Sequence, residues 1–200
     1  MKTLECSSRG DKRFSAKYAK VSVFGVVDTI ENHYQKSKRD MYGEHVKKGA
    51  PVDHFILDRM VYPASMLSAF YRLLWIKYLD KNPDLVEYAK QFDDFTDMFR
   101  GKSVNCQADV IRDYLTDREK LVASCSELKE RIQMNKIVSL NREIEYQIHI
   151  LNLVIDDLAS AVNNAEALTR HENAKGCLNE LYNLKLRHLK LSANTVAAGA

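Results

Sequence analysis

Apolar stretches and turn-forming residues alternate over the first 115 residues of the chain. β-Branched residues surround Gly25 in residues 21–27, which predicts two short strands joined by a turn. Asp28 and Glu31 have the spacing of a capping box, so a helix is predicted from there to about Arg39. Further apolar stretches predict a second hairpin and three more helices, at residues 55–62, 64–79, 83–91 and from about 105 onward.

The C-terminal part shows a different pattern, in which apolar residues recur at alternating spacings of three and four. This spacing is typical of the a and d positions of a helical seam or coiled coil. It occurs in three runs that are out of register: Leu121, Cys125, Leu128 and Ile132; Ile144, Ile148, Leu151, Ile155, Leu158 and Val162; Cys177, Leu181, Leu184, His188 and Leu191. We expect two or three antiparallel helices or an oligomerising hairpin, with breaks at Asn163–Asn164 and His171–Gly176.

Proline and the aromatic residues are concentrated in the first part of the chain. All three prolines precede residue 84, and 16 of the 18 aromatic residues lie at or before Tyr114. Because prolines mark turns and aromatic side chains fill compact cores, residues 1–117 are predicted to form a compact domain and 118–200 a helical extension. The expected fold class is α+β, predominantly helical, with small β elements.

Charge, hydropathy and cysteine content narrow the function classes. The net charge of +3 is too small to indicate nucleic-acid binding by bulk electrostatics, although residues 1–50 hold 11 basic and six acidic residues. No apolar run approaches the roughly 20 residues that cross a bilayer, and the N-terminus predicts no secretory signal. The four cysteines form no C-x-x-C pair, so a reducing cytoplasm is expected, with Cys106, Cys125 and Cys177 as small buried side chains.

A polar stripe follows the first predicted helix. Glu31, Tyr34, Gln35 and Lys38 stand at i, i+3, i+4 and i+7 and therefore share one helix face. A polar face that carries an aromatic residue has the makeup of a binding wall. In the structural alternative, Glu31 completes the capping box and Lys38 faces solvent or pairs with a neighbour.

A second cluster combines carboxylates, aromatic residues and a short glycine loop. Asp93, Asp94 and Asp97 alternate with phenylalanines and precede Arg100–Asn105. Gly101-Lys102-Ser103 resembles the end of a phosphate loop, but Thr96 stands where that motif requires its first glycine, which excludes a nucleoside triphosphatase. The structural alternative for these aspartates is helix termination and surface solvation.

Taken together, the two clusters resemble the NADAR domain family, which includes the YbiA-like N-glycosidases. The first family motif corresponds to Phe14-Ser15-Ala16, Gly25 and Glu31–Lys38, and the second to Leu85–Glu87, Asp93–Phe99 and Gly101–Asn105. Ala16 stands where the family has asparagine, the Trp-Gly that precedes the glycine loop is absent, and the C-terminal extension has no counterpart.

The resemblance implies cleavage of an N-glycosidic bond at ribose C1, without a metal or cofactor. It assigns Glu31 as the central carboxylate with Asp94 or Asp97 as its partner, and Lys38, Lys102 and the amides around Gly101 as ligands of a diphosphate. Tyr34 or Phe99 would stack on a base, while Gln35 and Asn105 would form hydrogen bonds. Ser15 completes the substrate-binding set, and Arg9, Lys12, Arg13, Lys17 and Lys20 form a basic rim for neighbouring phosphates.

The function expected from the resemblance is removal of ADP-ribose from guanine in nucleic acid, with DNA favoured over RNA. The setting would be the cytoplasm of a bacterium or a phage-infected host, in a toxin–antidote or counter-defence role. Two alternatives stay open: an N-glycosidase acting on a small metabolite such as a riboflavin-pathway intermediate, and a non-catalytic ADP-ribose-binding adaptor or helical assembly protein. Residues 118–200 would support a homo-oligomer in either case.

Overall fold

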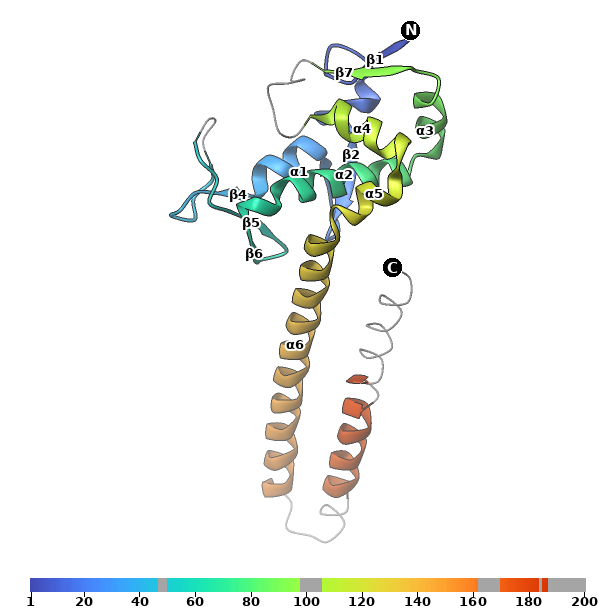
Figure 1. Cartoon of the computed structure of the whole chain (residues 1–200). Coiled ribbons are helices and arrows are strands. Elements are labelled where there is room, and N and C mark those ends of the chain that lie inside the picture. Colours follow the sequence, from blue (N-terminus) through green and yellow to red (C-terminus); the bar gives the residue numbers. More distant parts are fainter. Residues whose placement is uncertain (47–49, 98–105, 162–169, 184, 187–200) are drawn as a thin grey trace. The chain divides into compact units, whose positions relative to one another are not determined.

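The structure is a computed structural model, and it describes residues 1–46, 50–97, 106–161, 170–183 and 185–186 (Figure 1). The chain divides into two compact units, Met1–Arg131 and Ile132–Ala200, which are described separately. The predicted α+β class with small sheets and long C-terminal helices is confirmed. The first unit includes residues beyond 117, and where the functional domain ends stays a prediction.

Three small sheets form in the first unit. The predicted hairpin consists of β2 (Lys20–Val23) and β3 (Val26–Thr29), and its turn has positive φ at Phe24 and Gly25. A second sheet has the order β4-β5-β6, from Lys38–Arg39, His54–Leu57 and Met60–Pro63, and it contains the predicted second hairpin. The third pairs β1 (Thr3–Glu5) in parallel with β7 (Asp94–Thr96), two segments that the sequence did not predict as strands.

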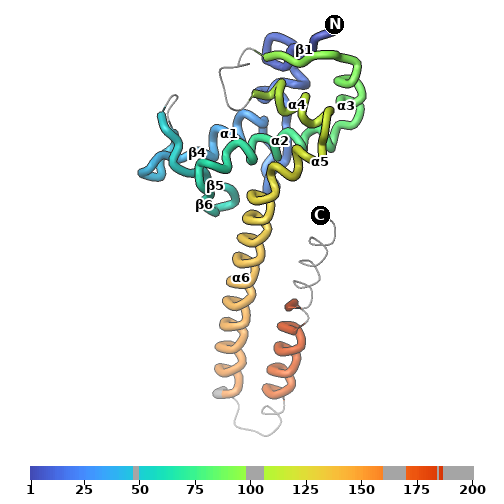
Figure 2. The backbone as a smooth tube through the Cα atoms, viewed as in Figure 1, coloured from blue at the N-terminus to red at the C-terminus, as the bar shows by residue number. Residues whose placement is uncertain are grey.

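The core of the first unit is built around one apolar helix. The segment that precedes it is the 3₁₀ turn η2 (Ala64–Met66), and the helix itself is α2 (Leu67–Asp80). Trp75 is fully buried on α2, and Phe70 and Leu74 are nearly so. α2 packs against α1 (Ile30–Ser37), α3 (Pro83–Ala89), α4 (Gln107–Thr116) and α5 (Arg118–Ala123), as the trace in Figure 2 shows.

The first of the three apolar runs in the C-terminal part belongs to this core rather than to a helical seam. Leu121 lies in α5, Cys125 in the turn that follows, and Leu128 in α6 (Ser126–Ala161), and all three are buried. The Cys125 thiol donates a hydrogen bond to the Ala69 carbonyl of α2 at 3.6 Å. The three-and-four spacing here reflects burial on the compact unit across a helix boundary, so this run is not one seam.

The second unit contains most of α6 and a helix at residues 170–183. Asp156 of α6 lies 3.5 Å from the Lys175 ammonium and 3.8 Å from the His171 imidazole, which links the two helices. The break predicted at His171–Gly176 is wrong, because these residues are helical, while Asn163–Asn164 lie outside the described residues. The middle run is buried only in part: Ile144 and Ile155 are buried, whereas Leu158 is 60% exposed.

The cysteine prediction is correct for two of its three residues. Cys106 and Cys125 are buried free thiols, but Cys177 is exposed, so the prediction for this residue is wrong. Cys177 lies in the helix at residues 170–183. Among the described residues, no helix is both long enough and apolar enough to span a membrane.

Candidate functional site

The polar stripe of α1 forms a connected network. The Gln35 amide nitrogen donates to Glu31 Oε1 at 2.9 Å, and Lys38 Nζ donates to Gln35 Oε1 at 3.0 Å. The Lys38 ammonium also lies 3.8 Å from the centre of the Tyr34 ring. Burial lowers the pKa of Lys38, and the negative charge of Glu31 opposes that shift. The chain of contacts holds the Glu31 carboxylate in place along the helix face.

The structural alternative for Glu31, a capping box, is wrong. The N-cap of α1 is Thr29, whose hydroxyl accepts from the Asn32 amide at 3.1 Å. Asp28 is still paired with Val21 in the hairpin, and its carboxylate accepts hydrogen bonds from Lys36, Asn32 and the Thr29 amide. Those bonds, led by that of Lys36, lower the pKa of Asp28. With Asn32 at the N3 position, the Glu31 side chain is not used by the helix terminus.

The two candidate partner carboxylates have different surroundings. Asp94 lies in β7 and pairs with Arg112 of α4 at 3.4 Å, and the same guanidinium donates to the Phe95 carbonyl and to Asp109. This geometry is that of a structural ion pair between strand and helix. Asp97 follows the strand, is only 5% exposed, and accepts a hydrogen bond from the Cys106 thiol at 3.3 Å.

A buried tyrosine packs against the polar stripe of α1. Tyr71 of α2 is 4% exposed and meets Tyr34 edge to face, with ring centres 5.1 Å apart. Burial raises the pKa of the Tyr71 hydroxyl, and the negative charges of Glu31 and Asp97 raise it further. The contact of the two rings joins α2 to the polar stripe of α1.

Tyr71 was missed by the sequence interpretation. It lies in a helix whose apolar run and three other aromatic side chains are explained by the core, so no local signal distinguishes it. Tyr34, proposed as a stacking residue, is 9% exposed and contacts both Tyr71 and the Lys38 ammonium. Its ring is therefore part of the packing of the site.

The backbone of the turn at residues 15–19 forms hydrogen bonds with residues of both α1 and α4. The Ala16 carbonyl accepts from the Glu31 amide at 2.9 Å, and the Ala16 amide donates to Gln107 Oε1 at 2.9 Å. Ser15 is 2% exposed, and its carbonyl accepts from the amides of Tyr18 and Ala19. Gln107, a buried amide that the sequence interpretation also missed, thus connects the start of α4 to the start of α1.

The five residues of the predicted basic rim are all exposed, namely Arg9, Lys12, Arg13, Lys17 and Lys20. Arg13 is held by Asp11 through hydrogen bonds of 2.6 to 3.2 Å and lies over the Tyr88 ring. The hydrogen bond to Asp11 raises the pKa of Arg13. Its charge is thus balanced within the protein, whereas no described carboxylate forms an ion pair with the three lysines.

Four of the predicted substrate-binding residues lie outside the described residues: Phe99, Gly101, Lys102 and Asn105. Their predicted roles stay predictions. Among the residues that the structure describes, no group of three or more His, Cys, Asp or Glu side chains could hold a metal ion.

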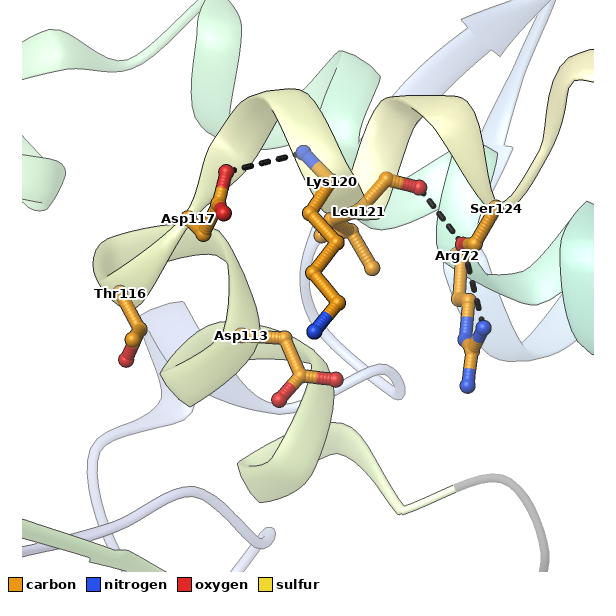
Figure 3. A pocket seen from close by; sticks show the side chains of 7 residues that line it. All are labelled: Arg72, Asp113, Thr116, Asp117, Lys120, Leu121 and Ser124. Carbon is orange, nitrogen blue, oxygen red and sulfur yellow. Dashed lines mark hydrogen bonds between the residues drawn. The ribbon is translucent and has the colours of Figure 1, made fainter.

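A cavity of about 420 Å³ lies apart from these residues (Figure 3). Its lining comes from α2, α4, α5 and the turn after α5, and consists of Arg72, Asp113, Thr116, Asp117, Lys120, Leu121 and Ser124. Asp117 accepts from the Lys120 amide as the N-cap of α5, and Arg72 donates to the Ser124 hydroxyl at 3.1 Å. These contacts join α5 to α2, and none of the predicted site residues lines this cavity.

Comparisons with known proteins identify the family of the chain. None of the curated proteins compared with the chain matches it. Residues 3–141 match the family described as DarT1-associated NADAR antitoxin, and this range contains every predicted site residue. The match covers more than half of the chain, and the chain therefore belongs to the DarT1-associated NADAR antitoxin family.

Proposed function

We propose that the protein reverses the ADP-ribosylation of DNA by a DarT1-type toxin and releases ADP-ribose from guanine. The family match supports the class of reaction. The observation that carries the assignment is the network on α1 in which Gln35 and Lys38 orient the Glu31 carboxylate; Asp97, which is 5% exposed and bonded to the Cys106 thiol, supplies the second carboxylate.

The reaction breaks the bond between ribose C1 and the base nitrogen, and water supplies the new oxygen at C1. The base leaves with the electron pair of that bond, so positive charge develops on the sugar as in glycoside hydrolysis. The Glu31 carboxylate stabilises this charge, because a fixed negative group acts more strongly in a partly buried site than in water. One proton passes from water to the departing nitrogen, and we assign its transfer to Asp97.

The remaining residues bind the substrate in this proposal. Lys38 presents its ammonium next to the Tyr34 ring and binds a phosphate together with Lys102. The basic rim contacts phosphates of the DNA, which position the strand without reading its sequence. Asp94 is assigned a structural role through Arg112.

Turnover of a defined substrate tests the proposal. An oligodeoxynucleotide with one ADP-ribosylated guanine is incubated with the full chain, and free ADP-ribose is measured over time. Glu31→Gln should lower kcat by about 10²- to 10³-fold, the range found when one charge-stabilising group is removed. Asp97→Asn should lower kcat by about 10²- to 10⁴-fold, as expected for a general acid–base group. Asp94→Asn is the matched control and should stay within a few fold.

Three outcomes would contradict the proposal. Binding of ADP-ribose without hydrolysis would indicate an adaptor, and hydrolysis of a free ribosylated nucleoside in preference to the oligonucleotide would indicate a metabolic enzyme. Near-wild-type turnover by Glu31→Gln would remove this residue from the mechanism. In cells, the active chain should restore growth when a DarT1-type toxin is expressed, and Glu31→Gln should not.

A further inference from the structure

The turn at residues 15–19 has two halves of opposite character. Ser15, Ala16 and Ala19 are almost completely buried, whereas Lys17 and Tyr18 between them are exposed. The amides of Tyr18 and Ala19 both donate to the Ser15 carbonyl at 2.9 Å, which closes the turn. Tyr18 is 48% exposed although it belongs to a tightly bonded segment.

The buried half of this turn is fastened to the helix that carries Glu31. The Ala16 carbonyl accepts from the Glu31 amide, and the Ala19 carbonyl accepts from the Ile30 amide, each at 2.9 Å. Tyr18 is two residues from Ala16, a distance of at most about 7 Å along the backbone. The backbone that carries the exposed aromatic ring is therefore held beside the start of α1.

One lysine lies over the Tyr18 ring, and two more are close to it in the chain. The Lys12 ammonium lies 5.2 Å from the ring centre, and Lys17 and Lys20 are exposed within two residues of Tyr18. Within the described residues, none of these three lysines forms an ion pair with a carboxylate. An exposed aromatic ring among uncompensated cations is the combination by which proteins bind single-stranded nucleic acid, with bases on the ring and phosphates on the cations.

We propose that Tyr18 stacks on the nucleobase next to the ADP-ribosylated guanine, with Lys12 and Lys17 binding the adjoining phosphates, so that the substrate is single-stranded or locally opened DNA. This inference rests on the proposed function and adds the form of its substrate. A duplex buries the faces of its bases in the stack, so a ring can reach one only after the strand is unpaired. Stacking is tolerant of sequence, so the identity of the neighbouring base should matter little.

The test compares one modified guanine in two settings, a single-stranded oligodeoxynucleotide and the free modified nucleoside. Loss of one base–aromatic stack weakens binding by about 5- to 100-fold, so Tyr18→Ala should raise KM for the oligonucleotide by that factor. Tyr18→Phe should keep the wild-type KM, since its ring also stacks. Both variants should hydrolyse the free nucleoside like the wild type. Tyr42→Ala, at a tyrosine that is 80% exposed elsewhere in the unit, is the matched control.

A binding measurement separates this inference from the proposed function. In the slow Glu31→Gln background, 2-aminopurine placed next to the modified guanine should lose fluorescence on binding, and Tyr18→Ala should abolish that change. If the wild type hydrolyses the oligonucleotide but Tyr18→Ala leaves KM and fluorescence unchanged, the stacking role is overturned. Preference of the wild type for duplex DNA, or for the RNA version of the strand, would overturn the assignment of the substrate form. If the wild type hydrolyses no substrate, the proposed function itself fails.

Discussion

Replacement of Gln107 by leucine should destabilise the protein and impair the site at the same time. The Gln107 side-chain oxygen accepts the Ala16 amide at 2.9 Å, and the two residues are 6% and 4% exposed. Leucine has a similar size but no acceptor, so the Ala16 amide would be buried without a partner. A buried unsatisfied polar group costs about 1–3 kcal/mol.

The expected loss of folding stability is measurable by two independent methods. For a chain of this size, each kcal/mol corresponds to about 2–4 °C in Tm, so Tm should fall by about 2–12 °C. Urea denaturation should give a lower midpoint with an unchanged slope, which would attribute the change to stability. Because Ala16 also accepts from the Glu31 amide, kcat should fall by more than the unfolded fraction explains.

Gln91→Leu provides the matched control, because Gln91 is exposed and its side chain makes no hydrogen bond among the described residues. Surface substitutions of this kind change stability by about 0.5 kcal/mol or less. Equal urea midpoints for Gln107→Leu and Gln91→Leu would refute the reasoning. Lower stability with unchanged kcat would show that the turn does not position Glu31.

Three further predictions concern other parts of the first unit. We expect the Tyr71 hydroxyl to donate a hydrogen bond to a charged group of the bound substrate, so Tyr71→Phe should fold normally but lower kcat/KM on the modified oligonucleotide by about 10- to 100-fold. An unchanged value would exclude the hydroxyl from the site. In the folded protein at pH 8, iodoacetamide should label the exposed Cys177 but not Cys106, because burial raises the pKa of the Cys106 thiol to about 12. Mass spectrometry of the digested protein measures which cysteine carries the label. The hydrogen bond from Arg118 lowers the pKa of Asp80, so this carboxylate stabilises the fold above its ordinary pKa of 3.8, and the contribution is lost as pH falls below that value. Asp80→Asn should therefore reduce the loss of folding stability at acidic pH. An unchanged loss would contradict the pairing.

The elements that the sequence predicts well are those with a strong local signal. The hairpin at Gly25 and the apolar helix that contains Trp75 form where the spacing of their residues places them. The pairing of Thr3–Glu5 with Asp94–Thr96 has no such signal. These three-residue strands are brought together by the packing of the unit across 88 intervening positions, and composition alone suggested a solvated acidic segment at the second of them.

The three-and-four spacing of the C-terminal part shows a second limit of prediction from sequence. A helix buries the same spacing of residues whether it packs on its own unit or on another helix. Leu121 and Leu128 satisfy the pattern but are separated by the end of α5, and they pack on the core of the first unit. Only the positions of helix ends distinguish the two cases, and those ends depend on single residues such as Ser124, whose hydroxyl donates to the Leu121 carbonyl.

The start of α1 depends on which of two adjacent residues is its N-cap. Asp28 and Thr29 are both good N-cap residues, and the choice between them decides whether Glu31 is used by the helix terminus. Thr29 is itself the last residue of β3, and it becomes the cap because its hydroxyl accepts the Asn32 amide, whereas the Asp28 carboxylate is occupied by the side chains of Lys36 and Asn32. The sequence motif is compatible with both outcomes, and the hydrogen bonds of these two side chains decide between them.

Ala16 shows why departure from a family motif need not indicate loss of function. It stands where the family has asparagine, yet its contacts to Glu31 and Gln107 are made by its backbone carbonyl and amide. Any residue other than proline supplies both groups, so the backbone contacts place little constraint on the side chain. We therefore expect the geometry around Glu31 to depend more on the acceptor at Gln107, which the motif does not include, than on the identity of residue 16.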